Sequence, residues 1–162
     1  MEKNKRNSDT YRTLLDKARR YCALAEQCED AVRQKLVTWG ATPAESNDIV
    51  DTLYSENYLD DVRYARAYCE SKILHQHWGR QKVLYQLRLK HLPRAAVEAG
   101  MAVVIDDDYL SVLSELAEKK LSELHRSVDD NTTLRQKLTA FLLSRGFLIG
   151  EINQITTNIL QQ

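Results

Sequence analysis

The centre of the chain carries the stretch Tyr58-Leu59-Asp60-Asp61-Val62-Arg63-Tyr64-Ala65-Arg66-Ala67-Tyr68, which joins two helical segments. Asn57, just before it, tolerates the left-handed conformation that ends many helices. Asp60 can accept hydrogen bonds from the free backbone N–H groups of a new helix, and Asp61 adds negative charge to the first turn, where the helix dipole favours it. An apolar stripe follows at helical spacing, made by Ala65, Tyr68 and Ile73. The stretch therefore predicts a boundary between two helical units.

The composition of the whole chain favours a globular, helical protein. Of its 162 residues, 28% are charged and 43% are apolar, and only 5 are Gly and 2 are Pro. Good helix formers such as Leu, Ala, Glu and Lys dominate. No apolar run approaches the roughly 20 residues that a membrane-spanning helix needs. Residues 1–10 lack the apolar core of an export signal, so we expect a cytoplasmic protein with no membrane segment.

Apolar spacing and capping signals predict nine helices in the order long, short, short, three times over. The clearest start is Thr42-Pro43-Ala44-Glu45, with a Thr cap, Pro in the first turn and Glu where a capping box needs it. Gly40 and Gly146 end two of the helices. The central long helix is expected over residues 61–76.

A register comparison supports three related units. At an offset of 51 residues Val32 maps to Val83 and Leu53 to Val104, and at an offset of 106 Val32 maps to Leu138. We predict an all-α fold of three tandem three-helix repeats, stacked as an elongated curved array of helices set at right angles. The expected division is a disordered tail over 1–8 and repeats over 9–57, 58–105 and 106–162.

The cysteines and histidines indicate no metal site. Cys22, Cys28 and Cys69 are odd in number and contain no Cys-x-x-Cys pair, so buried, reduced thiols are expected. The four histidines are scattered and are interpreted as surface or boundary residues: His75, His77, His91 and His125.

No sequence signature of catalysis is present. The chain has no glycine-rich phosphate loop, no metal-ligand cluster and no nucleophile–base pattern. The neighbouring acids at Asp60-Asp61 and at 106–108 stand at helix starts, where capping explains them. We therefore expect no catalytic residue, no metal and no cofactor, and a protein that is not an enzyme.

The formal net charge is zero, but the charges are unevenly distributed. Residues 71–97 contain six Lys or Arg and no Asp or Glu, whereas nine acids follow in residues 98–130. This pattern indicates a surface with two electrostatic faces, the acids of 106–108 lying away from the basic face. Ordinary solvated helix faces are the alternative.

The central stretch resembles the signature of the RecX family, the bacterial regulators of the recombinase RecA. The resemblance covers roughly residues 18–159 and includes 79–87, 32–36 with Gly40, and 142–147. Cys28, Ala31 and His91-Leu92 depart from the family pattern. The residues that match the family motif most closely are Tyr58, Leu59, Asp60, Asp61, Arg63, Tyr64, Ala65, Tyr68 and Gly79.

The resemblance implies three tandem three-helix repeats and a role in controlling RecA. Family members bind the RecA–DNA filament along its groove and inhibit recombinase, ATPase and co-protease activity, which limits DNA repair and the SOS response. Weak direct DNA binding and a monomeric state are also implied. From charge alone we hypothesise a partner-binding face made of Arg63, Arg66, Lys72, Arg80, Lys82, Arg88 and Lys90.

A helical nucleic-acid-binding protein that acts directly on DNA is the alternative function. Short helices joined by tight turns resemble helix-turn-helix units, and Trp39, Trp78 and Tyr85 could stack on bases. The zero net charge argues against this function, because phosphate binding normally requires a basic domain.

Overall fold

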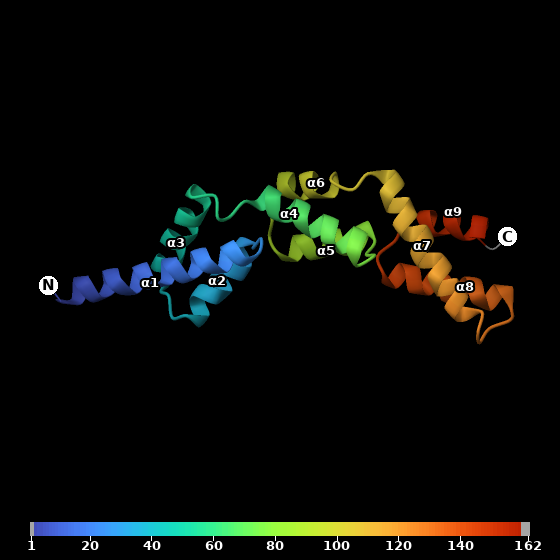
Figure 1. Cartoon of the computed structure of the whole chain (residues 1–162), viewed down its shortest axis with the longest axis horizontal. Helices are drawn as coiled ribbons and strands as arrows, with labels where there is room; N and C mark the ends of the chain where they lie inside the picture. Colours follow the sequence, from blue (N-terminus) through green and yellow to red (C-terminus); the bar gives the residue numbers. More distant parts are fainter. Residues whose placement is uncertain (1, 160–162) are drawn as a thin grey trace.

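The computed structural model is an extended row of helices with the two ends of the chain at opposite ends of the molecule (Figure 1). It describes residues 2–159, with side chains from Asp9 onward. Within this range the regular structure is entirely helical: α1 (Glu2–Leu24), α2 (Glu29–Thr38), α3 (Pro43–Ser55), α4 (Asp61–Glu70), the π-helical turn η1 (Ser71–His75), α5 (Arg80–Leu89), α6 (Arg94–Met101), α7 (Asp106–Leu124), α8 (Asn131–Ser144) and α9 (Ile149–Ile159).

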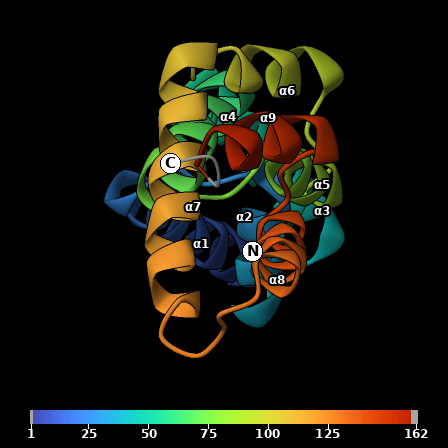
Figure 2. The ribbon, with the colours of Figure 1, turned by 90° about the vertical axis from the view of Figure 1, so that its right-hand side faces the viewer.

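The helices form three groups along the row, which we call unit 1 (α1–α3), unit 2 (α4–α6) and unit 3 (α7–α9). In each unit the third helix packs against the first. Seen from the C-terminal end, α7 runs along one side of unit 3, and α8 and α9 pack against it (Figure 2). The predicted all-α repeat array is confirmed.

The capping predictions are confirmed at the starts of α3 and α4 but are wrong for 106–108, because the N-cap residue of α7 is Ile105 and the three acids lie inside the first turn, where they complement the helix dipole. Asn57 has a φ of 60°, and the side chain of Asp60 accepts a hydrogen bond of 2.9 Å from the backbone N–H of Arg63. Thr42 and Glu45 form the reciprocal capping box at the start of α3. These contacts are local, so residue type and spacing suffice to predict them.

Two helix boundaries differ from the sequence prediction. The helix α1 begins at Glu2, whereas a disordered tail was expected over residues 1–8; residues 2–8 contain no Gly or Pro and include Glu, Lys and Arg, which continue a helix readily. The predicted helix over 61–76 widens into η1, where the N–H of Gln76 donates to the carbonyl of Ser71, five residues earlier.

The apolar core is divided between the units. One cluster belongs to unit 1 and includes Leu36, Ile49 and Leu53. The second runs without a break through units 2 and 3, from Tyr64 to Ile152, and also takes in Cys28 at the start of α2. Units 2 and 3 therefore share one core, while the contact between units 1 and 2 depends more on polar side chains.

The three cysteines are free and buried, as predicted. Burial raises the pKa of the Cys22 and Cys69 thiols from 9.0 to about 11 in each case. Because the thiolate is the reactive form, we expect both to react with a disulfide reagent at pH 8 at least about 100-fold more slowly in the folded protein than in urea. Peptide mapping of the labelled protein measures this, and equal rates in both states would contradict it.

The same pKa shifts predict a loss of stability at high pH. Between pH 9 and 11 these thiols ionise in the unfolded chain but stay protonated in the folded one, so the folded state binds more protons. The free energy of unfolding is therefore expected to fall as the pH rises through this window.

Candidate partner-binding surface

The seven basic residues predicted to bind a partner separate into three groups in the structure. Two arginines, Arg63 and Arg80, lie at the junctions between units. Three lysines, Lys72, Lys82 and Lys90, gather around aromatic rings. The remaining two, Arg66 and Arg88, are exposed on α4 and α5.

Arg63 ties unit 2 to unit 1. Its Nε lies 2.5 Å from a carboxylate oxygen of Glu26, and its Nη2 donates to the backbone carbonyl of Asn57 at 2.9 Å. This family-motif arginine therefore connects the end of α1 with the turn before α4. A contact of 2.6 Å between the Nδ1 of His91 and a carboxylate oxygen of Asp30 joins the same two units.

Arg80 ties unit 2 to unit 3. Its guanidinium lies 2.7 Å from a carboxylate oxygen of Asp106, donates to the carbonyl of Val104 at 2.9 Å, and sits 4.2 Å from the ring centre of Tyr109. The expectation that the acids of 106–108 face away from all the basic residues is wrong for Asp106. Arg80 is three-quarters buried at its side chain, so a structural role accounts for it.

The three lysines lie around aromatic rings that come from two segments, α4 and the turn before α5. Tyr64 and Tyr68 stack on α4 with ring centres 5.8 Å apart. The ammonium nitrogens lie over the rings, at the following distances from the ring centres: Lys72 at 5.5 Å from Tyr68 and 4.8 Å from Trp78, Lys82 at 4.3 Å from Trp78, and Lys90 at 5.6 Å from Tyr68 and 6.0 Å from Tyr64.

This geometry holds three positive charges in defined positions. The negative face of an aromatic ring attracts an ammonium group, by about 0.5–1 kcal/mol at an exposed site. The lysine side chains are half-buried on the rings, so less side-chain freedom remains to be lost when an anion binds. Lys72 also donates to Gln76 at 3.0 Å. The cluster is suited to carboxylates or phosphates on a partner.

Equivalent lysine–aromatic pairs occur in the other two units, again where the first and second helices meet. In unit 1, Lys17 lies 5.9 Å from the ring centre of Trp39 and Lys35 lies 5.6 Å from that of Tyr21. In unit 3, Lys120 lies 5.0 Å from the ring centre of Phe141. We call these three sites together the lysine–aromatic edge.

The register explains why the sequence analysis missed this edge. At the offset of 51 residues, Lys17 and Trp39 correspond to Tyr68 and Lys90, so cation and ring exchange places. At the offset of 106, Lys35 corresponds to Phe141, but its partner Tyr21 corresponds to Ser127 and not to a lysine. A residue-by-residue comparison of units 1 and 2 sees two mismatches, although the pairing of a cation with a ring is retained. Searching the register for swapped pairs would have found the pair shared by units 1 and 2.

Over the residues whose side chains are described, no group of three or more His, Cys, Asp or Glu could hold a metal ion. None of the described helices is both long and apolar enough to cross a membrane.

Comparison with known proteins gives consistent matches. The model of the second three-helix domain of RecX proteins matches residues 60–101, and that of the third matches residues 106–156. Regulatory protein RecX of Clostridium tetani is 25% identical over 94% of this chain and 69% of its own length. The protein of the same name from Clostridium botulinum is 31% identical over 74% of this chain and 55% of its own length. The one from Cronobacter sakazakii is 29% identical over 91% of this chain and 93% of its own length.

The chain thus spans little more than half to about two thirds of the clostridial relatives but nearly all of the Cronobacter one. Among solved structures, the crystal structure of RecX from Lactobacillus salivarius superposes with a TM-score of 0.83 at 19% identity, covering 96% of this chain and 99% of that one. At that identity the likeness concerns the fold.

Proposed function

The chain belongs to the RecX family, and on that premise we propose that it regulates RecA by binding the RecA–DNA filament. The family match carries this proposal. The presence of lysine–aromatic contacts in all three units supports it. The proposed effect is inhibition of recombinase, ATPase and co-protease activity in the cytoplasm. The protein acts as a monomer and has no reaction of its own.

The row of units suits a repeating partner. Successive protomers of a filament present the same surface again and again, and a row of three units can engage more than one of them. Linked weak contacts give a high overall affinity, because each further contact is intramolecular once the first has formed. The fixed ammonium groups of each unit would supply these contacts, either to acidic side chains of the filament or to phosphates of its DNA.

The experiment that tests the function measures ATP hydrolysis by a RecA recombinase on single-stranded DNA while this protein is titrated in. A fall at amounts well below one molecule per RecA protomer is expected, since a molecule that blocks filament growth acts on many protomers. No change at saturating amounts would refute the proposed function.

Direct binding to DNA is the second candidate, and the same lysine–aromatic edge favours it. Cations and rings side by side are the components of single-strand binding surfaces. Fluorescence anisotropy of a labelled oligonucleotide, alone and coated with RecA, separates the two candidates. Equal affinity for bare and coated DNA, falling steeply with salt, would support the second.

A further inference from the structure

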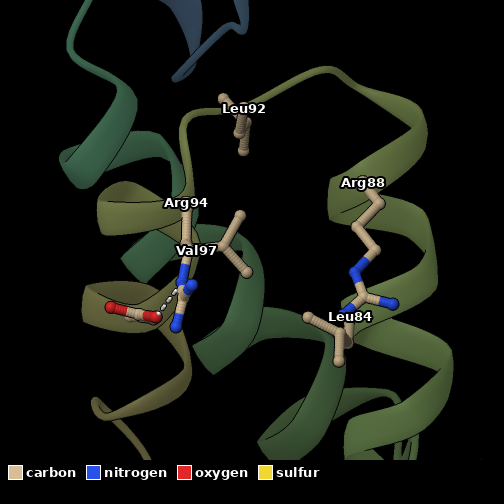
Figure 3. Close-up of a pocket in the computed structure, with 6 residues that line it drawn as sticks. Leu84, Arg88, Leu92, Arg94 and Val97 are labelled. Carbon is tan, nitrogen blue, oxygen red and sulfur yellow. Dashed lines mark hydrogen bonds and ion pairs between the residues drawn. The ribbon is translucent and has the colours of Figure 1, made fainter.

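Unit 2 has an open groove between α5 and α6, lined by none of the lysines and rings of the lysine–aromatic edge. It encloses about 520 Å³ and is lined by Leu84, Arg88, Leu92, Arg94, Val97 and Glu98. Figure 3 shows Leu84 and Arg88 projecting from α5, and Val97 projecting from α6, toward the space between the two helices. The groove is therefore a feature of the second and third helices of one unit.

The corresponding position in unit 1 is bridged by a side chain. Leu84 and Glu98 correspond to Arg33 and Asn47 at the offset of 51 residues. The Nη1 of Arg33 donates to the side-chain oxygen of Asn47 at 2.9 Å, which links α2 to α3. The Nε of Arg33 also donates to a carboxylate oxygen of Glu29 at 2.6 Å, which holds the guanidinium in place.

In unit 3 the residue that corresponds to Leu92 is larger and buried. The second and third helices of unit 2 map onto those of unit 3 at an offset of 55 residues. At this offset Leu92 corresponds to Phe147. Phe147 is only 2% exposed and its ring centre lies 5.5 Å from that of Tyr109. In unit 2 the smaller Leu92 is half-buried and lines the groove.

The groove has an apolar floor and a positively charged rim. The floor consists of Leu84, Leu92 and Val97. On the rim, Arg94 and Glu98 form an exposed ion pair of 2.6 Å, so their charges largely balance and Arg88 leaves the rim with a net positive charge. Two large exposed side chains of α5, Tyr85 at 59% and Leu89 at 54%, extend the apolar surface beside it.

We propose that this groove docks an acidic peptide segment of a partner protein. One side chain of leucine or phenylalanine size enters the apolar floor, and a carboxylate beside it pairs with Arg88. A volume of about 520 Å³ is in the range of ligand sites and exceeds what one such side chain needs. A nucleic acid has the charge but lacks the apolar anchor, so an acidic peptide complements both properties of the groove.

The test uses the full chain and a fluorescein-labelled twelve-residue peptide that carries one leucine among glutamate and serine. Anisotropy should show saturable binding that weakens at least about tenfold when the peptide's leucine becomes alanine, or when its glutamates become lysine. Equal binding of the lysine peptide or of the alanine peptide would overturn the proposal.

Two variants of the protein locate the binding site. Leu92→Phe places a larger side chain at a residue that lines the groove, and Arg88→Glu reverses the rim charge; each should weaken binding at least about tenfold. Lys137→Glu makes the same charge change at an exposed position of α8 and should leave binding unchanged. Circular dichroism confirms that the variants are folded. Unchanged binding by Arg88→Glu would overturn the proposal even if Leu92→Phe failed to fold.

The groove could instead hold a second copy of this chain. Sedimentation velocity distinguishes a second copy from a peptide as the occupant of the groove. Association of the chain that rises with concentration and that Leu92→Phe abolishes would overturn the peptide proposal. The RecA ATPase titration is a separate readout: if the protein fails to inhibit RecA but still binds the acidic peptide, the proposed regulation is refuted and the groove proposal stands.

Discussion

Replacing Lys72, Lys82 and Lys90 together by glutamate is expected to raise the amount of protein needed for half-inhibition of RecA's ATPase by about 100-fold. The three ammonium groups lie on neighbouring rings of unit 2, so the variant removes the densest positive cluster of the lysine–aromatic edge. An exposed charge contact is worth up to about 1 kcal/mol. The variant loses three such contacts with the partner and adds three negative charges that repel it, which together account for an effect of about 100-fold.

A matched control keeps the overall charge change but places it elsewhere. Arg20, Arg126 and Lys137 are exposed on other parts of the molecule, and their replacement by glutamate should change inhibition less than about threefold. The lysine-to-glutamine triple variant tests the cluster without adding negative charge and should show an intermediate loss. If both glutamate variants lose inhibition equally, net charge rather than the edge is responsible.

The choice of residues follows from their contacts. Arg63 and Arg80 are omitted because their ion pairs with Glu26 and Asp106 join neighbouring units. Reversing either charge would disturb the junction itself, and reduced inhibition would then report on folding. The three lysines contact rings through their ammonium groups, so their replacement should leave the helical circular dichroism signal unchanged.

The second large effect is expected for Gly79→Ala, which should destabilise the protein by about 3 kcal/mol or more. A Cβ atom at residue 79 would lie 2.1 Å from the carbonyl carbon and oxygen of Gly146. These are backbone atoms of unit 3 that cannot rotate away. Gly79 has an ordinary φ of −70°, so lack of space rather than backbone strain is the cause.

The same substitution would also break hydrogen bonds across the junction. The N–H of Gly79 donates to the carbonyl of Arg145 at 2.8 Å, and that of Gln81 donates to the carbonyl of Gly146 at 3.1 Å. A separation large enough for a methyl group lengthens both bonds and opens the core that units 2 and 3 share. Urea denaturation followed by circular dichroism measures the loss.

Gly150→Ala is the matched control. A Cβ there meets no atom within 4 Å, and the residue lies within α9, so alanine should be neutral or stabilise by about 0.5–1 kcal/mol. Unit 1 has a separate core and should unfold at a similar urea concentration in both variants. Equal stability of Gly79→Ala and the unchanged protein would contradict the tight junction.

The sequence alone predicted the helices, their principal caps and the repeat register. Thr42, Glu45 and Asp60 act within one turn of their own positions, and the apolar spacing of each helix is a local property. The same local signals did not reveal that α1 extends to Glu2 or that the central helix widens at Ser71–His75. A helix without Gly or Pro has no clear start, and a single π-helical turn leaves the apolar spacing almost unchanged.

Only the tertiary structure decided which basic residues remain available to a partner. In the sequence Arg63, Arg80 and Lys82 are equally charged. Folding pairs Arg63 with Glu26, 37 residues away, and Arg80 with Asp106, 26 residues away, while the half-buried Lys82 places its ammonium group over the Trp78 ring, 4.3 Å from the ring centre. These outcomes depend on how whole units stack, and the chain distance between the partners carries no information about that. Charge is a property of single residues, whereas the availability of a charge is a property of the packed array.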